Sequence, residues 1–431
     1  MISNVWKGVL FTLHTINNLT PMTDSNSVNS LSAPSVTPWR RAVIKVGSAL
    51  VSPNDDGCSA LYLQAICDFI IASKEQGKEI IVVSSGSIAA ARGSIKTGLK
   101  PSIAEKQAMA AIGQMRMMAN WAALFAPLCS VAPPMPAQQS TPLSQSSKKK
   151  SAFDCAQILV TVEDLADRKR FVNIKNTLEQ LLANNVIPIV NENDTVAVDE
   201  IKVGDNDNLA AHTAIAAQAD CLIICTDVDG LFTANPRTYA NAQLIKQVNV
   251  IDASVMALAD GVGSSVGTGG MVTKLQAAQK CTQSGIQTLL VNGTKASSFT
   301  ALANDECSGT IFAPIVRISN RHRAKQDWLA HTSKVKGKLL IDAGAAKALT
   351  KSGASLLAAG VVSIEGDFRA GDSVEIIHAN RPCCKGLVNY SSTELKRILG
   401  CKSDEIKTIL GYSASEAVVH RDNLVLATTN F

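Results

Sequence analysis

Apolar runs alternate with segments of helical periodicity along the chain from Arg41 onward. The run "RAVIKVGSALV" is rich in β-branched residues and breaks at Gly47, and "EIIVVSS" at 79–85 has the same character. Between them, "ALYLQAICDFIIASKEQG" spaces its apolar residues as one face of a helix and ends in glycine. Continuous apolar strands that alternate with helices are typical of a parallel sheet buried on both faces. The pattern therefore predicts an α/β domain with a mostly parallel sheet sandwiched by helices.

The same pattern continues through "NNVIPIVNEND", "ADCLIICTDVDG" and "IQTLLVNG", and it changes near residue 330. Beyond that point the elements become short, as in "KGKLLIDAGAAKAL", "VVSIEGDFRAGDSVEII" and "KGLVNYSS", with glycine turns between them. Short strands with such turns favour a small β-barrel-like domain. We therefore predict that a second, mostly β domain follows the α/β domain.

Two other stretches are polar and poor in apolar residues. The N-terminal stretch includes "TDSNSVNSLSAPSVTP", which cannot bury enough apolar surface to stay ordered. Residues 130–151 are rich in Pro, Ser and Gln and end in three lysines, which predicts a solvated surface insertion. The predicted division is a disordered tail at 1–38, a catalytic domain at 39–316, a linker at 317–332 and the second domain at 333–431.

Composition narrows the class of protein. Of the 431 residues, 46% are hydrophobic and 18% are charged, so two or three domains can each bury a core. The net charge of +5 does not demand a polyanionic partner. The 11 cysteines form no CxxC pair and no cluster at zinc spacing, which is typical of buried thiols in a reducing compartment. No run approaches the roughly 20 apolar residues of a membrane helix. We expect a cytoplasmic protein with no membrane partner.

Three loops at the C-terminal ends of predicted strands contain groups that bind anions. Lys45 stands inside an apolar run, where it either meets an anion or reaches solvent from an edge strand. "SSGSIAA", from Ser84, turns into a helix start that can bind an anion, although a hydroxyl-capped turn explains it as well. "GVGSSVGTGGMVTK" at 261–274 has more glycine than turn formation requires, and it resembles a phosphate-binding loop that ends in Lys274.

Two acid-rich stretches follow predicted strands at the same edge of the sheet. They are "NENDTVAVDEIKVGDNDN" at 191–208 and "CTDVDGLFTANPR" at 225–237. Acidic turns are often merely solvated, but ligands of open α/β sheets bind at the carboxyl ends of the strands. Anion-binding loops, lysines and carboxylates at one edge predict phosphoryl transfer with magnesium. No Ser/His/Asp or Cys/His set suits nucleophilic catalysis.

Taken together and in order, these motifs resemble the glutamate 5-kinases of the amino-acid kinase family. The matching stretches are "IKVGSALV", "VVSSGSIAAARG", "KQAMAAIGQ", "RFVNIKNTLEQLLANNVIPIVNENDTVAVDEIKVGDNDNLAA", "TDVDGLFTANPR" and "GTGGMVTKLQAA". The C-terminal domain is similar to a PUA domain. The resemblance implies that the γ-phosphoryl group of ATP is transferred to the side-chain carboxylate of L-glutamate, giving L-glutamyl 5-phosphate in the first step of proline biosynthesis. It also implies dependence on Mg²⁺ and feedback inhibition by proline.

The resemblance assigns roles residue by residue. Lys45 and Lys274 resemble the pair that neutralises the transferring phosphoryl group, and Asp207 resembles the carboxylate that orients them. Ser85, Asp194 and Asn206 resemble the glutamate-binding set. The nucleotide contacts carried over are Lys45, Thr226, Asp227, Thr268, Gly269, Gly270, Met271, Val272, Thr273 and Lys274. No protein ligand of the metal is assigned.

Partners and alternatives complete the prediction. The resemblance implies a homo-oligomer, a dimer or a tetramer, and allows channelling of the product to glutamyl-phosphate reductase. Another amino-acid kinase, acting on N-acetylglutamate or aspartate, would share the lysines and glycine loops but not the "NEND…GDNDN" pairing or the appended domain. PUA domains often bind RNA. We do not expect it here, because this one lacks a dense basic stripe with aromatic platforms, but the question stays open.

Overall fold

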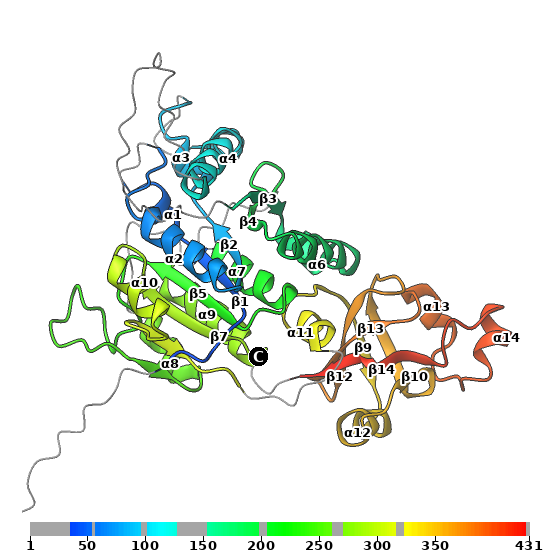
Figure 1. Ribbon diagram of the computed structural model, residues 1–431. Coiled ribbons are helices and arrows are strands. Elements are labelled where there is room, and N and C mark those ends of the chain that lie inside the picture. The colour runs from blue at the N-terminus through cyan, green and yellow to red at the C-terminus, as the bar shows by residue number, and fades with distance from the viewer. Residues whose placement is uncertain are drawn as a thin grey trace, which may run out of the picture. The chain divides into compact units, whose positions relative to one another are not determined.

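Figure 1 shows the computed structural model, which describes most of the chain. The described strands form two separate sheets. The described residues are 35–53, 57–95, 101–126, 153–197, 205–260, 270–315 and 323–427. Among them, no helix is long and apolar enough to cross a membrane. The insertion predicted at 130–151 lies outside the described residues, as does nearly all of the predicted tail.

The first sheet has eight described strands in the order β3-β4-β2-β1-β5-β7-β8-β6. Its strands are β1 (Arg41–Val46), β2 (Glu79–Ser84), β3 (Cys155–Val160), β4 (Ile187–Glu192), β5 (Cys221–Thr226), β6 (Gln247–Val248), β7 (Gln287–Asn292) and β8 (Thr310–Phe312). The described neighbours pair in parallel except β7 with β8. Val46 pairs with both Ser84 and Cys225, so the ends of β2, β1 and β5 meet at one edge. The predicted mostly parallel sheet is confirmed.

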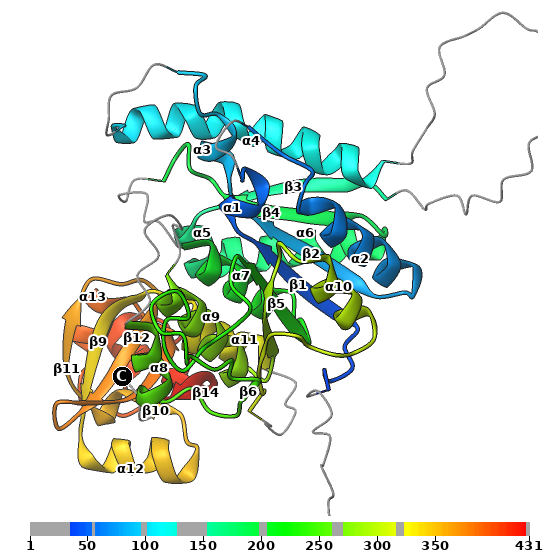
Figure 2. The same cartoon turned by 90° about the vertical axis from the view of Figure 1, so that its left-hand side faces the viewer.

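Helices cover both faces of this sheet. One face packs against α2 (Leu63–Glu75), α4 (Ile103–Phe125) and α10 (Ala296–Ala303), and the other packs against α6 (Arg168–Ala183), α7 (Asp205–Ala216) and α9 (Met271–Gln283). Figure 2 shows α4 on one side of β3 and β4, with α6 and α7 on the other. The smaller helices of this domain are α1 (Ser48–Val51), α3 (Ser87–Ala90), α5 (Val162–Ala166) and α8 (Ala253–Asp260).

The alternation of side chains along β1 decides which face Lys45 reaches. Ala42, Ile44 and Val46 belong to the core under α2 and α4, whereas Val43 belongs to the core under α7 and α9. Because successive side chains of a strand point to opposite faces, Lys45 shares the face of Val43. The first residues of α7 and α9 are therefore within its reach.

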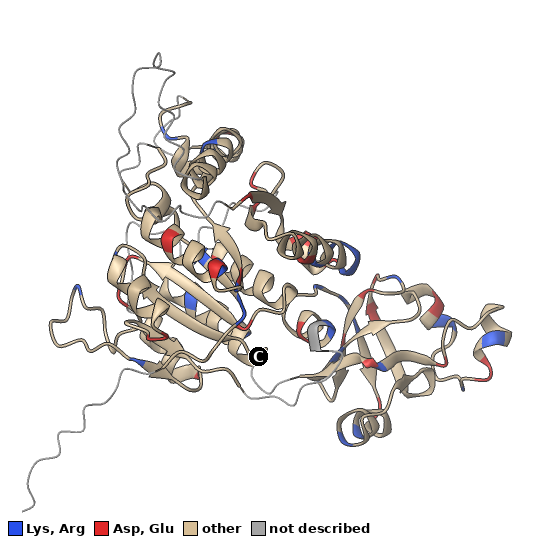
Figure 3. Cartoon of the chain, viewed as in Figure 1, with Lys and Arg blue, Asp and Glu red and all other residues tan. Residues whose placement is uncertain are grey.

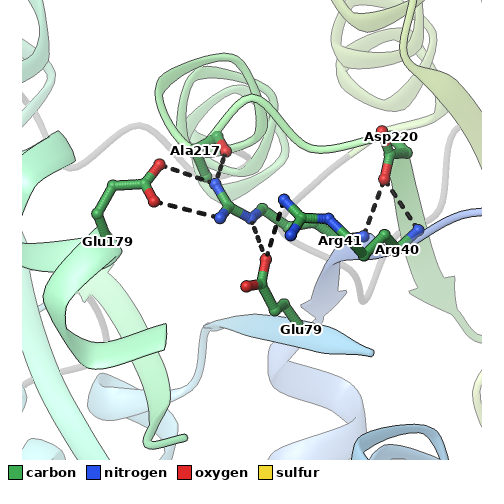
Figure 4. A network of polar contacts seen from close by, with 6 residues as sticks. All are labelled: Arg40, Arg41, Glu79, Glu179, Ala217 and Asp220. Carbon is green, nitrogen blue, oxygen red and sulfur yellow. Dashed lines mark hydrogen bonds and ion pairs between the residues drawn. The ribbon is translucent and has the colours of Figure 1, made fainter. Parts of the chain in front are cut away.

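The opposite end of β1 is held by a buried arginine, drawn in Figure 4. The Nε of Arg41 donates to Glu79 on β2 at 2.7 Å, and its Nη1 donates to Glu179 on α6 at 2.9 Å. The same Nη1 also donates to the carbonyl of Ala217, just after α7. Asp220 accepts the backbone N–H of Arg41 at 2.9 Å. One guanidinium thus joins two strands and two helices at the end of the sheet away from the loops.

The second sheet has its own buried core and the described order β10-β14-β13-β12-β9-β11. Its strands are β9 (Val335–Ile341), β10 (Leu356–Leu357), β11 (Val361–Gly366), β12 (Ser373–His378), β13 (Arg381–Val388) and β14 (Ala417–Leu426). Short helices connect them: α12 (Ala343–Ser352), the 3₁₀ turn η1 (Ala358–Gly360), α13 (Ser392–Arg397) and α14 (Ile406–Leu410). A small domain of short strands agrees with the prediction.

The structure differs from the predicted segment boundaries at two places. Val36, assigned to the tail, is buried, and its N–H donates to the carbonyl of Asp305 at 2.9 Å. The segment predicted as a linker contains the helix α11 (Arg323–His331). Its Trp328 is 1% exposed and donates from Nε1 to the carbonyl of Leu165 at 2.8 Å. Both segments are ordered because an apolar side chain packs into a neighbouring core, although the sequence around it is polar.

Candidate active site

A buried carboxylate between two lysines forms the centre of the candidate site. Asp207, at the start of α7, is 0% exposed. Its Oδ1 lies 2.9 Å from Nζ of Lys45 on β1, and its Oδ2 lies 3.1 Å from Nζ of Lys274 on α9. Lys45 is on a central strand and is buried, so the alternative of an edge lysine that reaches solvent is excluded. The structure brings together the three residues predicted to be catalytic.

The charges of this cluster depend on one another. Burial alone would raise the pKa of Asp207, but the ammonium groups of Lys45 and Lys274 outweigh burial and lower that pKa from 3.8 to about 2. Burial lowers the pKa of Lys274, and Asp207 only partly compensates. One carboxylate facing two ammonium groups leaves a net positive charge in a site with little water. An anionic ligand is attracted to such a charge.

The first turn of α9 adds backbone donors next to the lysines. Gly270 caps this helix in an extended conformation, and Met271 and Val272 follow it. The hydroxyl of Thr273 lies 2.7 Å from Oδ2 of Asp207, so it helps to hold that carboxylate. The N-terminus of a helix with unpaired N–H groups is an anion-binding element. Thr268 and Gly269, also predicted to contact the nucleotide, lie outside the described residues.

Two other predicted nucleotide residues stand at the end of β5. Thr226 is buried, and its hydroxyl donates to Oδ1 of Asp227 at 3.2 Å. The other carboxylate oxygen of Asp227 accepts from Arg237 at 3.0 Å. Asp227 is also close enough to act on the charge of Lys274. The structure therefore places this pair at the same edge of the sheet as the end of β1, the strand that carries Lys45.

The predicted substrate residues form a second group around the loop after β2. Nδ2 of Asn206 donates to Oγ of Ser85 at 2.6 Å. Asp194, after β4, accepts from Oγ of Ser87 at 2.8 Å, and burial raises the pKa of its carboxyl. Gly86 has φ of +110°, a left-handed conformation that favours glycine and that turns the loop sharply into α3. A half-buried carboxylate of this kind is suited to receive an ammonium group.

Sequence reasoning assigned no role to two amides of this second group. Asn191 accepts from Nδ2 of Asn206 at 2.9 Å and donates to Oε1 of Gln114 at 2.8 Å. Asn191 stands in "NEND" and Gln114 in "KQAMAAIGQ", so both lie in motifs that carried the resemblance. Neither was selected, because a single sequence does not distinguish a buried amide on a helix or strand from an exposed one.

A cavity of about 280 Å³ opens beside this amide group. Its wall includes Gln114 and Met115 from α4, Glu192 at the end of β4, and Asn193 and Asp194 after it. The wall is thus acidic on one side and carries an amide on another. A small zwitterion matches this combination better than a purely anionic ligand does.

Among the residues that the structure describes, no group of three or more His, Cys, Asp and Glu side chains could hold a metal ion. A Mg²⁺ bound mainly by phosphate oxygens and water needs few protein ligands. The site is therefore compatible with a metal that arrives with a nucleotide.

Comparison with known proteins agrees with this geometry. The model of the amino acid kinase family matches residues 40–292, and the PUA domain model matches residues 337–410. The chain belongs to the amino acid kinase family. It is 45% identical to glutamate 5-kinase of Salinibacter ruber over 397 residues, which are 90% of this chain and 97% of that protein. It is 44% identical to glutamate 5-kinase of Idiomarina loihiensis, covering 90% of this chain and 98% of that one. As a member of the amino acid kinase family, the protein is an enzyme that uses ATP.

Proposed function

We propose that the protein transfers the γ-phosphoryl group of ATP to the side-chain carboxylate of L-glutamate, giving L-glutamyl 5-phosphate and ADP. The observation that carries this proposal is the pair of lysines on Asp207, together with the half-buried Asp194 in the wall of a cavity. The lysines suit a phosphoryl group, and Asp194 suits the ammonium group of an amino acid. The glutamate 5-kinase relatives, matched over nearly their whole length, support the choice of substrate.

The chemistry follows from the charges. The side-chain carboxyl of glutamate, with an ordinary pKa of about 4.3, is ionised at neutral pH and needs no general base. One of its oxygens attacks the γ-phosphorus, the bond from that phosphorus to the bridging oxygen breaks, and ADP leaves with that electron pair. The main barrier is repulsion between two anions. Lys45 and Lys274 offset it by stabilising the charge on the transferring group, and Asp207 keeps both ammonium groups in place.

Binding contacts are divided between the two ends of the site. We propose that Asp194 accepts the α-ammonium group of glutamate, and that Ser85 and Asn206 hold the substrate by hydrogen bonds. We propose that Thr226, Asp227 and the segment from Thr268 to Lys274 contact the nucleotide. Mg²⁺, if it is held mainly by the nucleotide, would supply positive charge that offsets the charge of the phosphates.

Further proposals rest on resemblance to glutamate 5-kinases and not on geometry. We propose that the reaction is the first step of proline biosynthesis and that proline inhibits it. We also propose a homo-oligomer, a dimer or tetramer, and a product that can pass to glutamyl-phosphate reductase.

The decisive experiment is a coupled assay of ADP release in the presence of Mg²⁺. L-glutamate, N-acetylglutamate, aspartate and carbamate would be offered separately, each with and without proline. We expect turnover with L-glutamate alone, reduced by proline. Turnover with N-acetylglutamate or aspartate in place of L-glutamate would assign the protein to another branch of the family. Omission of Mg²⁺ with added chelator should abolish the activity.

A further inference from the structure

A chain of side-chain amides connects the loop after β2 to the buried face of α4. Asn206 donates to Asn191, and Asn191 donates to Gln114, at 2.9 and 2.8 Å. Gln114 is 8% exposed and Asn191 is 1% exposed. Nε2 of Gln114 is buried and has no hydrogen-bond partner among the described residues. A buried donor without an acceptor is costly, so such a group in a native protein usually has a function.

The orientation of every amide in this chain is determined from one end. Nδ2 of Asn206 faces the backbone carbonyl of Ser84 at 3.5 Å, and a carbonyl oxygen can only accept. The group of Asn206 at that position must therefore be NH₂, so it donates to Oδ1 of Asn191. The NH₂ of Asn191 then donates to Oε1 of Gln114. In this arrangement each amide donates to the next, and the NH₂ of Gln114 is left as the free donor among the described residues.

The free donor belongs to a residue that lines the acidic cavity. Gln114 shares the wall of that cavity with Glu192 and Asp194. A carboxylate that entered a space with two acids would be repelled unless a donor met it. The acids favour an ammonium group, whereas the amide favours an acceptor. Together they match the two charged substituents on the α-carbon of an amino acid.

We propose that Nε2 of Gln114 donates a hydrogen bond to the α-carboxylate of the substrate, and so selects an α-amino acid over a simple ω-amino acid. This inference rests on the proposed phosphorylation of L-glutamate and deepens it. The substrate would lie with its α-carbon in the cavity and its side-chain carboxylate toward Lys45 and Lys274. Gln114 would then be a substrate-binding residue with no part in the phosphoryl transfer itself.

The packing of α4 supports a fixed position for Gln114. A Cβ on the preceding residue, Gly113, would lie 1.7 Å from the carbonyl oxygen of Ser87. Only glycine allows α4 to approach the loop after β2 this closely. The amide is thus carried by a helix that is packed against the loop containing Ser85, and its position does not depend on a flexible segment.

The test compares two ligands in the wild type and in Gln114→Glu. The variant keeps an acceptor for Asn191 but loses the donor. The ligands are L-glutamate and 4-aminobutanoate, which has the amino group and the reacting carboxylate but lacks the α-carboxylate. We expect the KM for L-glutamate to rise about 10- to 100-fold, with kcat and the KM for ATP little changed. The constant for competitive inhibition by 4-aminobutanoate should stay the same or fall.

Two further variants separate this role from a structural one. Gln114→Met removes the donor without adding charge and should lose the same discrimination between the two ligands. Asn120→Asp makes the same amide-to-carboxylate change on α4 away from the cavity, and it should leave the KM for L-glutamate unaltered. Thermal melting of each variant shows whether it folds.

The inference would be overturned if both Gln114 variants kept the wild-type ratio of the KM for L-glutamate to the inhibition constant of 4-aminobutanoate. The proposed function would then still stand. Equally weakened binding of both ligands would also overturn it, because the amide would then affect binding only by stabilising the folded structure. A wild-type protein that releases no ADP with L-glutamate would instead refute the proposed function.

Discussion

At the scale of single residues, Asp207 is the group on which the candidate site depends. It is buried and contacts Lys45, Thr273 and Lys274, which come from three different elements. Its neighbour Asn206 belongs to the amide group around the cavity. Two adjacent residues therefore belong to the two side-chain groups of the candidate site, and the proposed function assigns Asp207 to the phosphoryl group and Asn206 to the amino acid.

Replacing Lys274 by methionine should remove most of the turnover. The ammonium group acts on charge that develops during the transfer, so kcat should fall about 10²- to 10³-fold while the protein still folds. The matched control is Lys280→Met on the same helix, where the ammonium group contacts Asn208 and not Asp207. Steady-state kinetics and circular dichroism check both. Wild-type kcat in Lys274→Met would contradict its role.

The ion pairs of Asp207 should make stability depend on pH at the acid end. Its pKa is lowered from 3.8 to about 2, so the pairs stabilise the folded state fully above pH 4. This contribution, on the order of 2 kcal/mol, is lost as the pH falls toward 2. Urea titrations between pH 6 and 2 should therefore show wild type and Asp207→Asn converging in acid. A constant difference across that range would refute the pKa assignment.

At the scale of elements, Gly113 lets α4, which lines the cavity, pack closely against α3. Gly113→Ala should push the helix away from the carbonyl of Ser87, because the added Cβ has no space. We expect a loss of about 1–3 kcal/mol of stability and a higher KM for L-glutamate. Gly344→Ala, in exposed α12, is the control and should be neutral or slightly stabilising. Equal effects of the two substitutions, measured by chemical denaturation, would disprove the close packing.

The other end of the sheet depends on Arg41. Arg41→Met should cost about 2 kcal/mol of stability, because it leaves Glu79 and Glu179 without their buried partner. The kinetic constants should be unchanged, since the arginine lies at the opposite end of β1 from Lys45. Arg40→Met is the matched control, because the Arg40 side chain is 72% exposed and pairs with Glu79 only at 3.7 Å. Chemical denaturation should distinguish the two variants.

At the scale of the whole molecule, the residues of the candidate site all come from the first sheet and its helices. The second domain has a separate sheet and a core of its own, although Leu387 belongs to the core of the first domain. In the view of Figure 3, acidic and basic residues are intermingled over this domain.

Removing residues 333–431 should therefore spare the chemistry. A chain that ends at Thr332 keeps α11 and all proposed catalytic and substrate residues. We expect its kcat and its KM for L-glutamate to stay within about an order of magnitude of wild type. A truncated protein that folds but has no activity would show that the second domain supports the site.

Much of the fold could be predicted because it depends on local pattern. Buried parallel strands are continuous apolar runs, and helices have a 3.6-residue period, so β1, β2 and α2 were recognisable from residues 41–85. Lys45, Asp207 and Lys274 were selected because charged residues next to buried strands and glycine loops are uncommon, and because the motifs resembled a known family. The roles of these residues remain predictions.

The tertiary structure alone decided which of these groups meet. Asp207 lies more than 60 residues from Lys274 and more than 160 from Lys45, and no local pattern states that its two oxygens face both lysines. The amides of Asn191 and Gln114 became recognisable only as members of a hydrogen-bonded chain, because the direction of a hydrogen bond depends on the partner in space. The burial of Trp328 could not be predicted from the sequence, because it depends on a core formed by distant segments. The sequence by itself determined the elements and the chemistry available at their ends, whereas contacts between distant segments determined how that chemistry is arranged.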